Sequence, residues 1–338
     1  MTGRGRHLRV GVCLSLSGRY GRFGGQARAG LEVWRAWAGA VELVVEDDES
    51  RPDVLESGLL RLAEQCDILL GPYSTQLMRR AGDVAARLDR LIWNHGGAGD
   101  DVEAAHPGHV VSVPTPASRY AEPFLHHLAS EAGGVPMWIA HGKGGFGRQV
   151  AAGAEVTARS LSIPAVRVAT GRLSPPAGTR RWALMCAGSF EEDVETVRNA
   201  LALANPPSRL CAVAAGVREF GQVVGDPRGV YGVGQWSPGS GGKPELGPAE
   251  ADFVAAYTER AGVPPDYPAV QAAATAAIAV HCARATGSTS RDALWSAATR
   301  LQTTTMFGDF RIDPLTGTQT AHRTVLVRWD AGGPSPVR

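Results

Sequence analysis

Short apolar runs alternate with longer segments of helical periodicity along almost the whole chain. Leu8–Leu16 is an apolar run, and Gln26–Trp37 behind it has the spacing of an amphipathic helix. Val41–Val45 is the next apolar run, and Val54 and Leu62 mark one face of the helical segment that follows. Repeated strand–helix units of this kind predict an α/β fold in which mostly parallel sheets are flanked by helices, with right-handed crossovers.

The stretch from Cys66 to Thr75 shows the repeating unit most clearly. Ile68–Leu70 is typical of a buried parallel strand, a Gly-Pro pair ends it, and Ser74 precedes a helical pattern that runs to about Asp89. The first N–H groups of a helix are unpaired and the helix dipole is positive at that end, so the start of this helix is a candidate anion-binding site. From this unit alone the simpler interpretation is that Ser74 only caps its helix, since serine and threonine are common caps.

The same reasoning predicts the remaining elements. Further strands are expected at 91–93, 110–113, 135–140, 165–169, 182–186, 210–214, 230–233, 307–312 and 324–329. Further helices are expected at 118–130, from the glycine-rich segment 141–147 to about 160, and at 191–203, 248–261, 267–285 and 291–301. Ser50 is expected to cap the helix that carries Pro52 in its first turn. The short, proline-rich segment 171–181 is expected to be a loop where a crossover helix is usual.

The tally of strands and helices divides into two halves. Proline-rich junctions at 114–116 and 238–248 separate them, which predicts one lobe of residues 1–117 with 238–322 and a second of 118–237 with 323–338. Open parallel sheets bind ligands beyond the carboxyl ends of their strands, so the cleft between the lobes is the expected site.

Composition excludes several partners. The 338 residues carry a net charge of +1 without a run of five like charges, which argues against a nucleic-acid or anionic-membrane surface. The five cysteines lie in or beside apolar runs, show no metal-ligand spacing, and are expected to be free thiols in a reducing compartment: Cys13, Cys66, Cys186, Cys211 and Cys282.

The amino-terminal residues give an expectation about location. They are basic, but Leu8–Leu16 contains Arg9 and no cleavage site of small residues follows, so no signal peptide is recognised. The protein is therefore expected to be cytoplasmic, or extracytoplasmic if an export signal is missing from this sequence. The alanine-rich stretch 267–283 is expected to be a packed helix rather than a membrane span.

Enzyme motifs are incomplete. Gly18, Gly21 and Gly24 follow a strand but miss the dinucleotide fingerprint by one glycine position, which leaves an NAD(P)-dependent enzyme as a minor alternative. The segment 141–145 holds glycines and a lysine without the spacing of a phosphate loop. No nucleophile, base and orienting group come together, so we expect a protein without catalytic residues, metal or cofactor.

Motifs in a fixed order carry a resemblance to a known family. They are 10–21 (VGVCLSLSGRYG), 30–32 (GLE), 44–48 (VVEDD), 70–74 (LGPYS), 146–148 (FGR), 235–238 (QWSP) and 307–317 (FGDFRIDPLTG). Together they resemble the type I periplasmic binding proteins, and most closely the branched-chain amino acid (leucine/isoleucine/valine) branch of ABC transporter receptors. The resemblance implies a two-lobed clamshell with several hinge crossings that closes on a small ligand.

The resemblance also implies roles for residues at strand ends. Ser74 and Thr75 match hydroxyls that hold a ligand carboxylate, and the other expected ligand-binding residues are Tyr20, Tyr73, Asn94, His95, Gly96, Gly97, Phe146, Ser189, Phe190 and Gln235. Where the family often has an acid for the ligand ammonium, this chain reads Ala-Gly-Val-Arg-Glu at 215–219. An amino acid, an amide, and an aliphatic or aromatic acid therefore all stay open as ligands.

The expected function is non-catalytic binding of a small polar or carboxylate-bearing ligand for an ABC transporter, with its permease as partner. A cytoplasmic ligand sensor of the amide-sensing type, which regulates a partner protein, is the alternative in the same fold.

Overall fold

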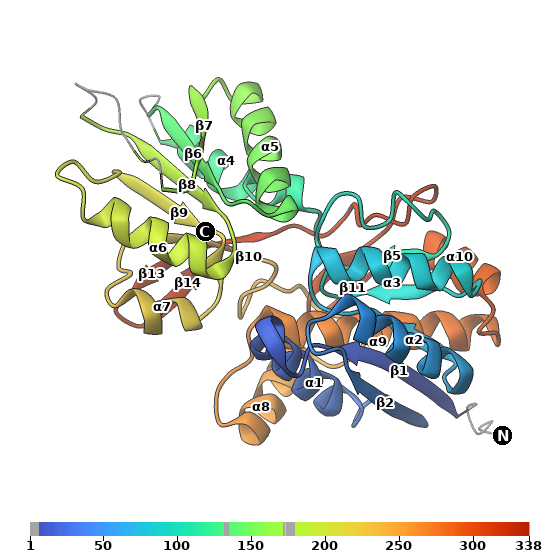
Figure 1. Ribbon diagram of the computed structural model, residues 1–338. Helices are drawn as coiled ribbons and strands as arrows, with labels where there is room; N and C mark the ends of the chain where they lie inside the picture. The colour runs from blue at the N-terminus through green and yellow to red at the C-terminus, as the bar shows by residue number, and fades with distance from the viewer. Residues whose placement is uncertain (1–6, 132–134, 172, 174–179, 338) are drawn as a thin grey trace. The chain divides into compact units, whose positions relative to one another are not determined.

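The computed structural model describes residues 7–131, 135–171, 173 and 180–337 (Figure 1). Its contacts divide the chain into unit 1, Met1–Thr115 with Pro238–Arg323, and unit 2, Pro116–Ser237 with Thr324–Arg338. Each unit has a sheet with helices packed on it, which confirms the α/β fold predicted from the alternating pattern.

The main sheet of unit 1 has five parallel strands. In order across the sheet they are β2 (Val41–Asp47), β1 (Leu8–Leu14), β3 (Ile68–Leu70), β4 (Ile92–Asn94) and β5 (Val110–Ser112). Val10 of β1 lies opposite Leu43 on one side and Ile68 on the other. Because the strands are parallel, their carboxyl ends meet at one edge, where the loops that carry candidate site residues begin.

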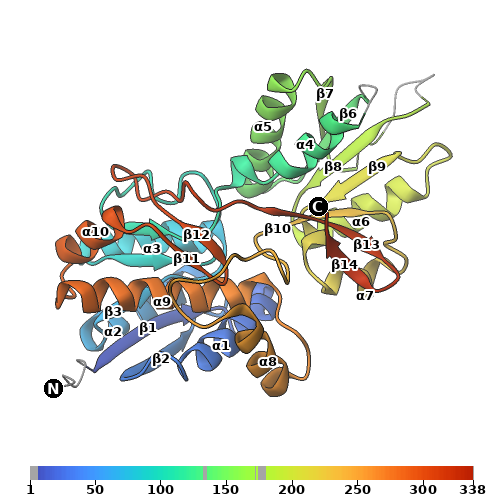
Figure 2. The same ribbon diagram turned by 180° about the vertical axis from the view of Figure 1, so that it is seen from behind.

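Helices cover this sheet and surround it. They are η1 (Gly18–Tyr20), α1 (Gly21–Trp34), α2 (Pro52–Gln65), α3 (Thr75–Arg87), α8 (Glu250–Ala261), α9 (Tyr267–Thr286) and α10 (Arg291–Arg300). α2 and α3 share a buried core with the strands that includes Leu59 and Met78. α1 packs along α9 (Figure 2), and a Cβ at Gly30 would lie 2.3 Å from the Ala269 carbonyl oxygen, so only glycine permits this approach.

The sheet of unit 2 has seven strands. Their order is β14 (Gly333–Pro336), β13 (Val325–Asp330), β10 (Tyr231–Gly234), β9 (Arg209–Ala212), β8 (Ala183–Ala187), β6 (Met137–His141) and β7 (Ala165–Ala169). β13 and β14 are antiparallel to their neighbours, and the other pairings are parallel.

The helical elements of unit 2 are η2 (Ala117–Arg119), α4 (Glu122–Ser130), α5 (Gly145–Ser160), α6 (Phe190–Leu201), η3 (Ala214–Gly216) and α7 (Glu219–Val224). The buried core contains Trp182 and Phe220, and the Phe220 ring lies 5.9 Å from the Trp329 ring. Strand β13, which carries Trp329 near the end of the chain, thus completes this core.

Ser50 does not cap its helix, and that prediction is wrong. α2 begins at Pro52 after Arg51, and no side chain caps it. The Ser50 hydroxyl instead accepts from the Tyr20 N–H at 3.0 Å and donates to the Ser17 carbonyl at 2.8 Å. Hydrogen bonds to residues distant in the sequence therefore take the place of the expected cap of α2.

Other differences come from short or irregular elements. The helix expected from residue 118 begins only at Glu122, after the separate η2 turn. The strand expected at 307–312 is the shorter β12 (Gly308–Phe310), paired with β11 (Thr303–Thr305), which was not predicted. The loop expected at 171–181 falls mostly outside the described residues.

All five cysteines are buried with free thiols. Within the described part of the chain, every helix is too short or too polar to cross a membrane.

Candidate ligand-binding site

The start of α3 follows the carboxyl end of β3, as its sequence predicts. The Ser74 hydroxyl caps the helix by accepting from the Leu77 N–H at 3.3 Å. The Ser74 carbonyl accepts from the Met78 N–H at 3.0 Å. The N–H groups of Thr75 and Gln76 lie in the first turn, where the helix itself offers them no carbonyl acceptor. Their partial positive charge is therefore directed outward from the start of the helix. This arrangement suits a carboxylate or another small anion.

Ser74 has an unusual backbone conformation. Its φ of 87° and ψ of 145° lie in a region that L-residues rarely occupy. The Ser74 N–H donates to the Gly96 carbonyl at 3.2 Å, and Tyr73 forms a bridge with Gly96. A Cβ at Gly96 would lie 2.6 Å from the Tyr73 Cα, so glycine is required there. The loops after β3 and β4 are thus held together at close range.

Asn94, expected to bind ligand, organises the loop after β4. Its side chain is fully buried, and its Oδ1 accepts from the N–H groups of Gly96 at 3.0 Å and Gly97 at 2.8 Å. Its Nδ2 donates to the Gly97 carbonyl at 2.6 Å and to the Ser112 hydroxyl at 2.7 Å. Hydrogen-bonding groups of three expected site residues are therefore engaged with one another.

Thr75 contacts the same loop, and His95 is its first residue. The Thr75 hydroxyl accepts from the Gly99 N–H at 3.0 Å, which ties the start of α3 to the loop. His95 is fully buried, and burial lowers the pKa of its imidazole to about 4, an effect that the nearby backbone of Gly71 partly opposes. The imidazole is neutral at neutral pH.

Three rings form what we call the aromatic wall: Tyr20, Phe23 and Tyr73. The Phe23 and Tyr73 rings are stacked with centroids 4.4 Å apart, and the Tyr20 ring lies 6.1 Å from Tyr73. The guanidinium of Arg22 lies 5.1 Å from the Phe23 ring centroid, and that of Arg19 lies 5.7 Å from the Tyr20 centroid. The structure therefore brings together the two expected tyrosines and adds Phe23.

Sequence reasoning did not select Phe23. A usable signal existed, because Phe23 lies three residues after Tyr20 at the beginning of a helix, where that spacing places two side chains on one side. It also missed Tyr267, whose hydroxyl lies 2.5 Å from the Tyr73 hydroxyl although the two residues are 194 positions apart. No local pattern could indicate that contact.

In unit 2, two expected residues meet around a third that was not expected. Phe146, in the first turn of α5, packs edge-on against the Tyr120 ring at 5.2 Å. Gln235, directly after β10, is buried and donates from Nε2 to the Tyr120 hydroxyl at 2.7 Å. Tyr120 therefore connects the carboxyl end of β10 with the start of α5.

Ser189 and Phe190 lie at the start of α6, beyond the carboxyl end of β8. Ser189 caps α6 in a capping box: its hydroxyl accepts from the Glu192 N–H at 3.3 Å, and Glu192 Oε2 accepts from the Ser189 N–H at 2.9 Å. Asp193 is buried, accepts from the Gly188 N–H at 2.7 Å and the Ala214 N–H at 3.0 Å, and burial raises its pKa to about 7. These acids hold loops in place.

The acids after β2 in unit 1 are also engaged. Asp48 accepts from the Ser15 hydroxyl at 2.6 Å, and Asp47 accepts from the Leu16 N–H at 2.9 Å and the Ser17 hydroxyl at 2.8 Å. Among the described residues, no group of three or more His, Cys, Asp or Glu side chains could hold a metal ion.

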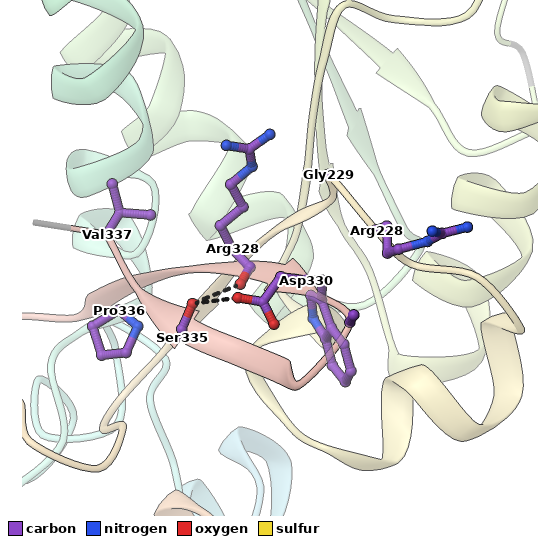
Figure 3. A pocket seen from close by; sticks show the side chains of 9 residues that line it. Arg228, Gly229, Arg328, Asp330, Ser335, Pro336 and Val337 are labelled. Carbon is purple, nitrogen blue, oxygen red and sulfur yellow. Dashed lines mark hydrogen bonds between the residues drawn. The ribbon is translucent and has the colours of Figure 1, made fainter.

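A pocket in unit 2 lies away from these strand ends (Figure 3). It is lined by residues that precede β10 and by the β13–β14 hairpin, including Arg228, Arg328 and Asp330. The Arg228 guanidinium pairs with Asp226 at 2.5 Å, and the Arg328 guanidinium lies 5.8 Å from the Tyr231 ring centroid. Because β10 begins at Tyr231, this pocket is at the amino edge of the parallel strands, opposite the edge where α/β sheets bind ligands.

The sequence matches the family described as periplasmic binding protein over residues 7–179 and 206–334. No curated protein sequence matches it.

Solved structures share the fold at low sequence identity. A leucine-binding protein, LivK, from Thermotoga maritima has a TM-score of 0.81 at 14% identity, with 98% of each chain covered. A solute-binding protein of an ABC transporter from Rhodopseudomonas palustris, in complex with 3,4-dihydroxybenzoic acid, has a TM-score of 0.78 at 14% identity over 98% of this chain and 95% of that one. LivJ from Streptococcus pneumoniae, in complex with isoleucine, has a TM-score of 0.77 at 13% identity, covering 98% and 99%.

Proposed function

Because this chain belongs to the periplasmic binding protein family, we propose that it binds a small polar or carboxylate-bearing molecule and catalyses no reaction. The ligand classes are those of an amino acid, an amide, or an aliphatic or aromatic acid. The protein acts as the substrate-binding component of an ABC transporter, and a permease is its partner. Among the solved relatives, LivK is named a leucine-binding protein, LivJ is in complex with isoleucine, and the Rhodopseudomonas palustris protein is in complex with 3,4-dihydroxybenzoic acid, which supports the amino acid and aromatic acid classes.

The start of α3 is the observation that carries this proposal. Ser74 is held at a φ of 87° by the loop after β4, and its hydroxyl sits at the positive end of the helix. Backbone strain of this kind persists only where surrounding structure enforces it, and it clusters at binding sites. Tyr73, the residue directly before Ser74, carries a ring that stacks on Phe23 in the aromatic wall. The ligand carboxylate binds at Ser74 and Thr75, and its apolar part contacts the aromatic wall.

Unit 2 by itself has candidate binding groups that follow the carboxyl ends of its own strands. Phe146 and Phe190 supply apolar surface, and Gln235 and Ser189 supply hydrogen-bonding groups. Tyr120 fixes the side chains of Phe146 and Gln235.

Isothermal calorimetry with a panel of candidate ligands tests the proposal. The panel is L-leucine, L-isoleucine, benzoate, 3,4-dihydroxybenzoate and acetamide, with NADH and NADPH as probes of the enzyme alternative. Saturable one-site binding of a panel member, without its conversion to product, supports a binding protein. Binding of a nicotinamide cofactor, with none of the five small ligands bound, contradicts it.

The glycines near residue 20 give the enzyme alternative no support. A Cβ at Gly24 would lie 2.0 Å from the Ser15 carbonyl oxygen, and one at Gly18 would lie 2.4 Å from the Glu49 carbonyl oxygen. Packing against the protein's own backbone therefore accounts for both glycines.

The transporter role is tested separately from the ligand-sensor alternative. Co-purification of the protein with a permease would support a transporter component rather than a ligand sensor.

A further inference from the structure

Tyr73 is the central ring of the aromatic wall, and elements far apart in the sequence hold it. It lies in the loop between β3 and α3, where Tyr73 forms an isolated bridge with Gly96. Phe23 of α1 stacks on one face of the ring at 4.4 Å, with the planes 12° apart. The Tyr73 hydroxyl lies 2.5 Å from the hydroxyl of Tyr267, the first residue of α9.

Tyr267 is a fixed point for this contact because α9 is the most enclosed helix of unit 1. Most of its residues are buried, and α1 packs along it (Figure 2). The packing is so close that Gly30 has no room for a Cβ beside Ala269, two residues after Tyr267. A helix held this way cannot shift without disturbing the core.

Burial holds the pKa of the Tyr267 phenol well above its usual range, and the Tyr73 hydroxyl raises it further. The Tyr267 phenol therefore keeps its proton at physiological pH. Because the Tyr267 hydroxyl stays protonated, a donor for the hydrogen bond between the two hydroxyls is always present. This hydrogen bond restrains rotation of the Tyr73 side chain.

We propose that Tyr267 is a positioning residue of the ligand site, whose hydroxyl locks the Tyr73 ring in the aromatic wall before a ligand arrives. This proposal rests on the proposed function in one respect: it assumes that the aromatic wall contacts the ligand. Ordering a mobile side chain costs free energy on binding, so a ring that is already fixed strengthens binding without adding a contact to the ligand.

Fluorine NMR of the ligand-free protein, with 3-fluorotyrosine in place of its six tyrosines, tests the positioning directly. The Tyr73 resonance is assigned by its loss in Tyr73→Phe. In Tyr267→Phe this resonance should move toward the position of free 3-fluorotyrosine, because the hydrogen bond that restrains rotation of the ring is lost and only the stacking on Phe23 is left. Tyr257→Phe is the matched control, since Tyr257 is a buried tyrosine of the same unit that packs on Phe253 instead. An unchanged Tyr73 resonance in Tyr267→Phe would overturn the proposal.

Calorimetry with 3,4-dihydroxybenzoate adds a readout that a merely structural role would not move. Tyr267→Phe should weaken binding about two- to tenfold, the cost of immobilising one side chain. In the Tyr73→Phe background the same substitution should have no further effect, and equal losses in both backgrounds would contradict the mechanism. If the parent protein does not bind this probe, that result counts against an aromatic acid as the ligand, while the fluorine spectra still decide the role of Tyr267.

Discussion

The side chain of Asn94 forms two hydrogen bonds with the backbone of Gly97: Oδ1 accepts from the Gly97 N–H at 2.8 Å, and Nδ2 donates to the Gly97 carbonyl at 2.6 Å. A carboxamide can do this because it carries an acceptor and two donors on one planar group. The loop after β4 is thereby fixed, and with it the Gly96 carbonyl that accepts from the Ser74 N–H. The geometry of the proposed anion site therefore depends on a residue that need not touch the ligand.

Asn94→Ala should lower the free energy of unfolding by roughly 2–4 kcal/mol, because it leaves several buried backbone and hydroxyl groups without partners. Urea denaturation measures this. Asn199→Ala, an exposed asparagine on α6, is the control and should change stability little. Equal stability of the two variants would show that the Asn94 bonds contribute nothing net.

His95 should make stability fall in mild acid. Its folded-state pKa of about 4 lies below its ordinary value of 6.5, so between these pH values the unfolded state binds more protons than the folded state. Stability is therefore intact above about pH 6.5 and is lost as pH falls toward 4. Relative to His95→Leu, which cannot titrate, the parent should lose about 3 kcal/mol over this range. Parallel pH profiles of the two proteins would refute the assignment.

Glu103 should have the opposite effect. It is buried, and burial raises the pKa of its carboxyl from 4.5 to about 7, although the Ser112 hydroxyl partly opposes this. The folded state keeps the proton while the unfolded state loses it, so stability falls as pH rises from about 4.5 to about 7. Relative to Glu103→Gln, the parent should lose stability over that window, and denaturation curves at each pH would reveal it. A parent that gains stability there would contradict the burial argument.

The five cysteines should react slowly in the folded protein. Burial raises the pKa of Cys66 to about 11 and that of Cys282 to about 12, so little thiolate forms at neutral pH. In denaturant without reductant, a thiol reagent should count all five. A count of three or fewer would mean that a disulfide had formed.

The sequence allowed prediction of whatever depends on local periodicity. The strand–turn–helix unit around Ser74 is present as expected, because its apolar run, Gly-Pro break and hydroxyl cap all favour the same structure. β14 was missed because Gly-Pro-Ser-Pro is a poor strand sequence, and it forms only as the last strand of the sheet, where proline is tolerated. β11 is three threonines long, too short for a periodic signal.

The site was predictable only in outline. Strand-end positions such as Ser74, Tyr73 and Asn94 could be recognised, since parallel sheets collect function there. What each side chain does there depends on tertiary contacts. The engagement of Asn94 with its own loop, the contact of Tyr73 with Tyr267 and the positive φ of Ser74 all arise from chain segments that meet only on folding. Serine gives no sign of such a backbone conformation, which glycine or asparagine would suggest.

The claim that a ligand carboxylate binds at the start of α3 is tested most directly at Ser74. Ser74→Ala removes the cap and keeps the strained φ, so it should lower stability by about 1 kcal/mol. Ser74→Gly relieves that strain while remaining a good cap residue, so its stability should equal or exceed that of the parent. The two variants share only the loss of the hydroxyl.

The decisive measurement is a calorimetric titration of the parent, Ser74→Ala and Ser74→Gly with the carboxylate from the panel that binds most tightly. If the hydroxyl donates to that carboxylate, both variants should bind about ten- to a hundredfold more weakly, because hydrogen bonds to charged groups are the stronger kind. The loss should be similar in the two variants although their stabilities differ. Parent-like affinity in Ser74→Gly would contradict the account and place the anion elsewhere.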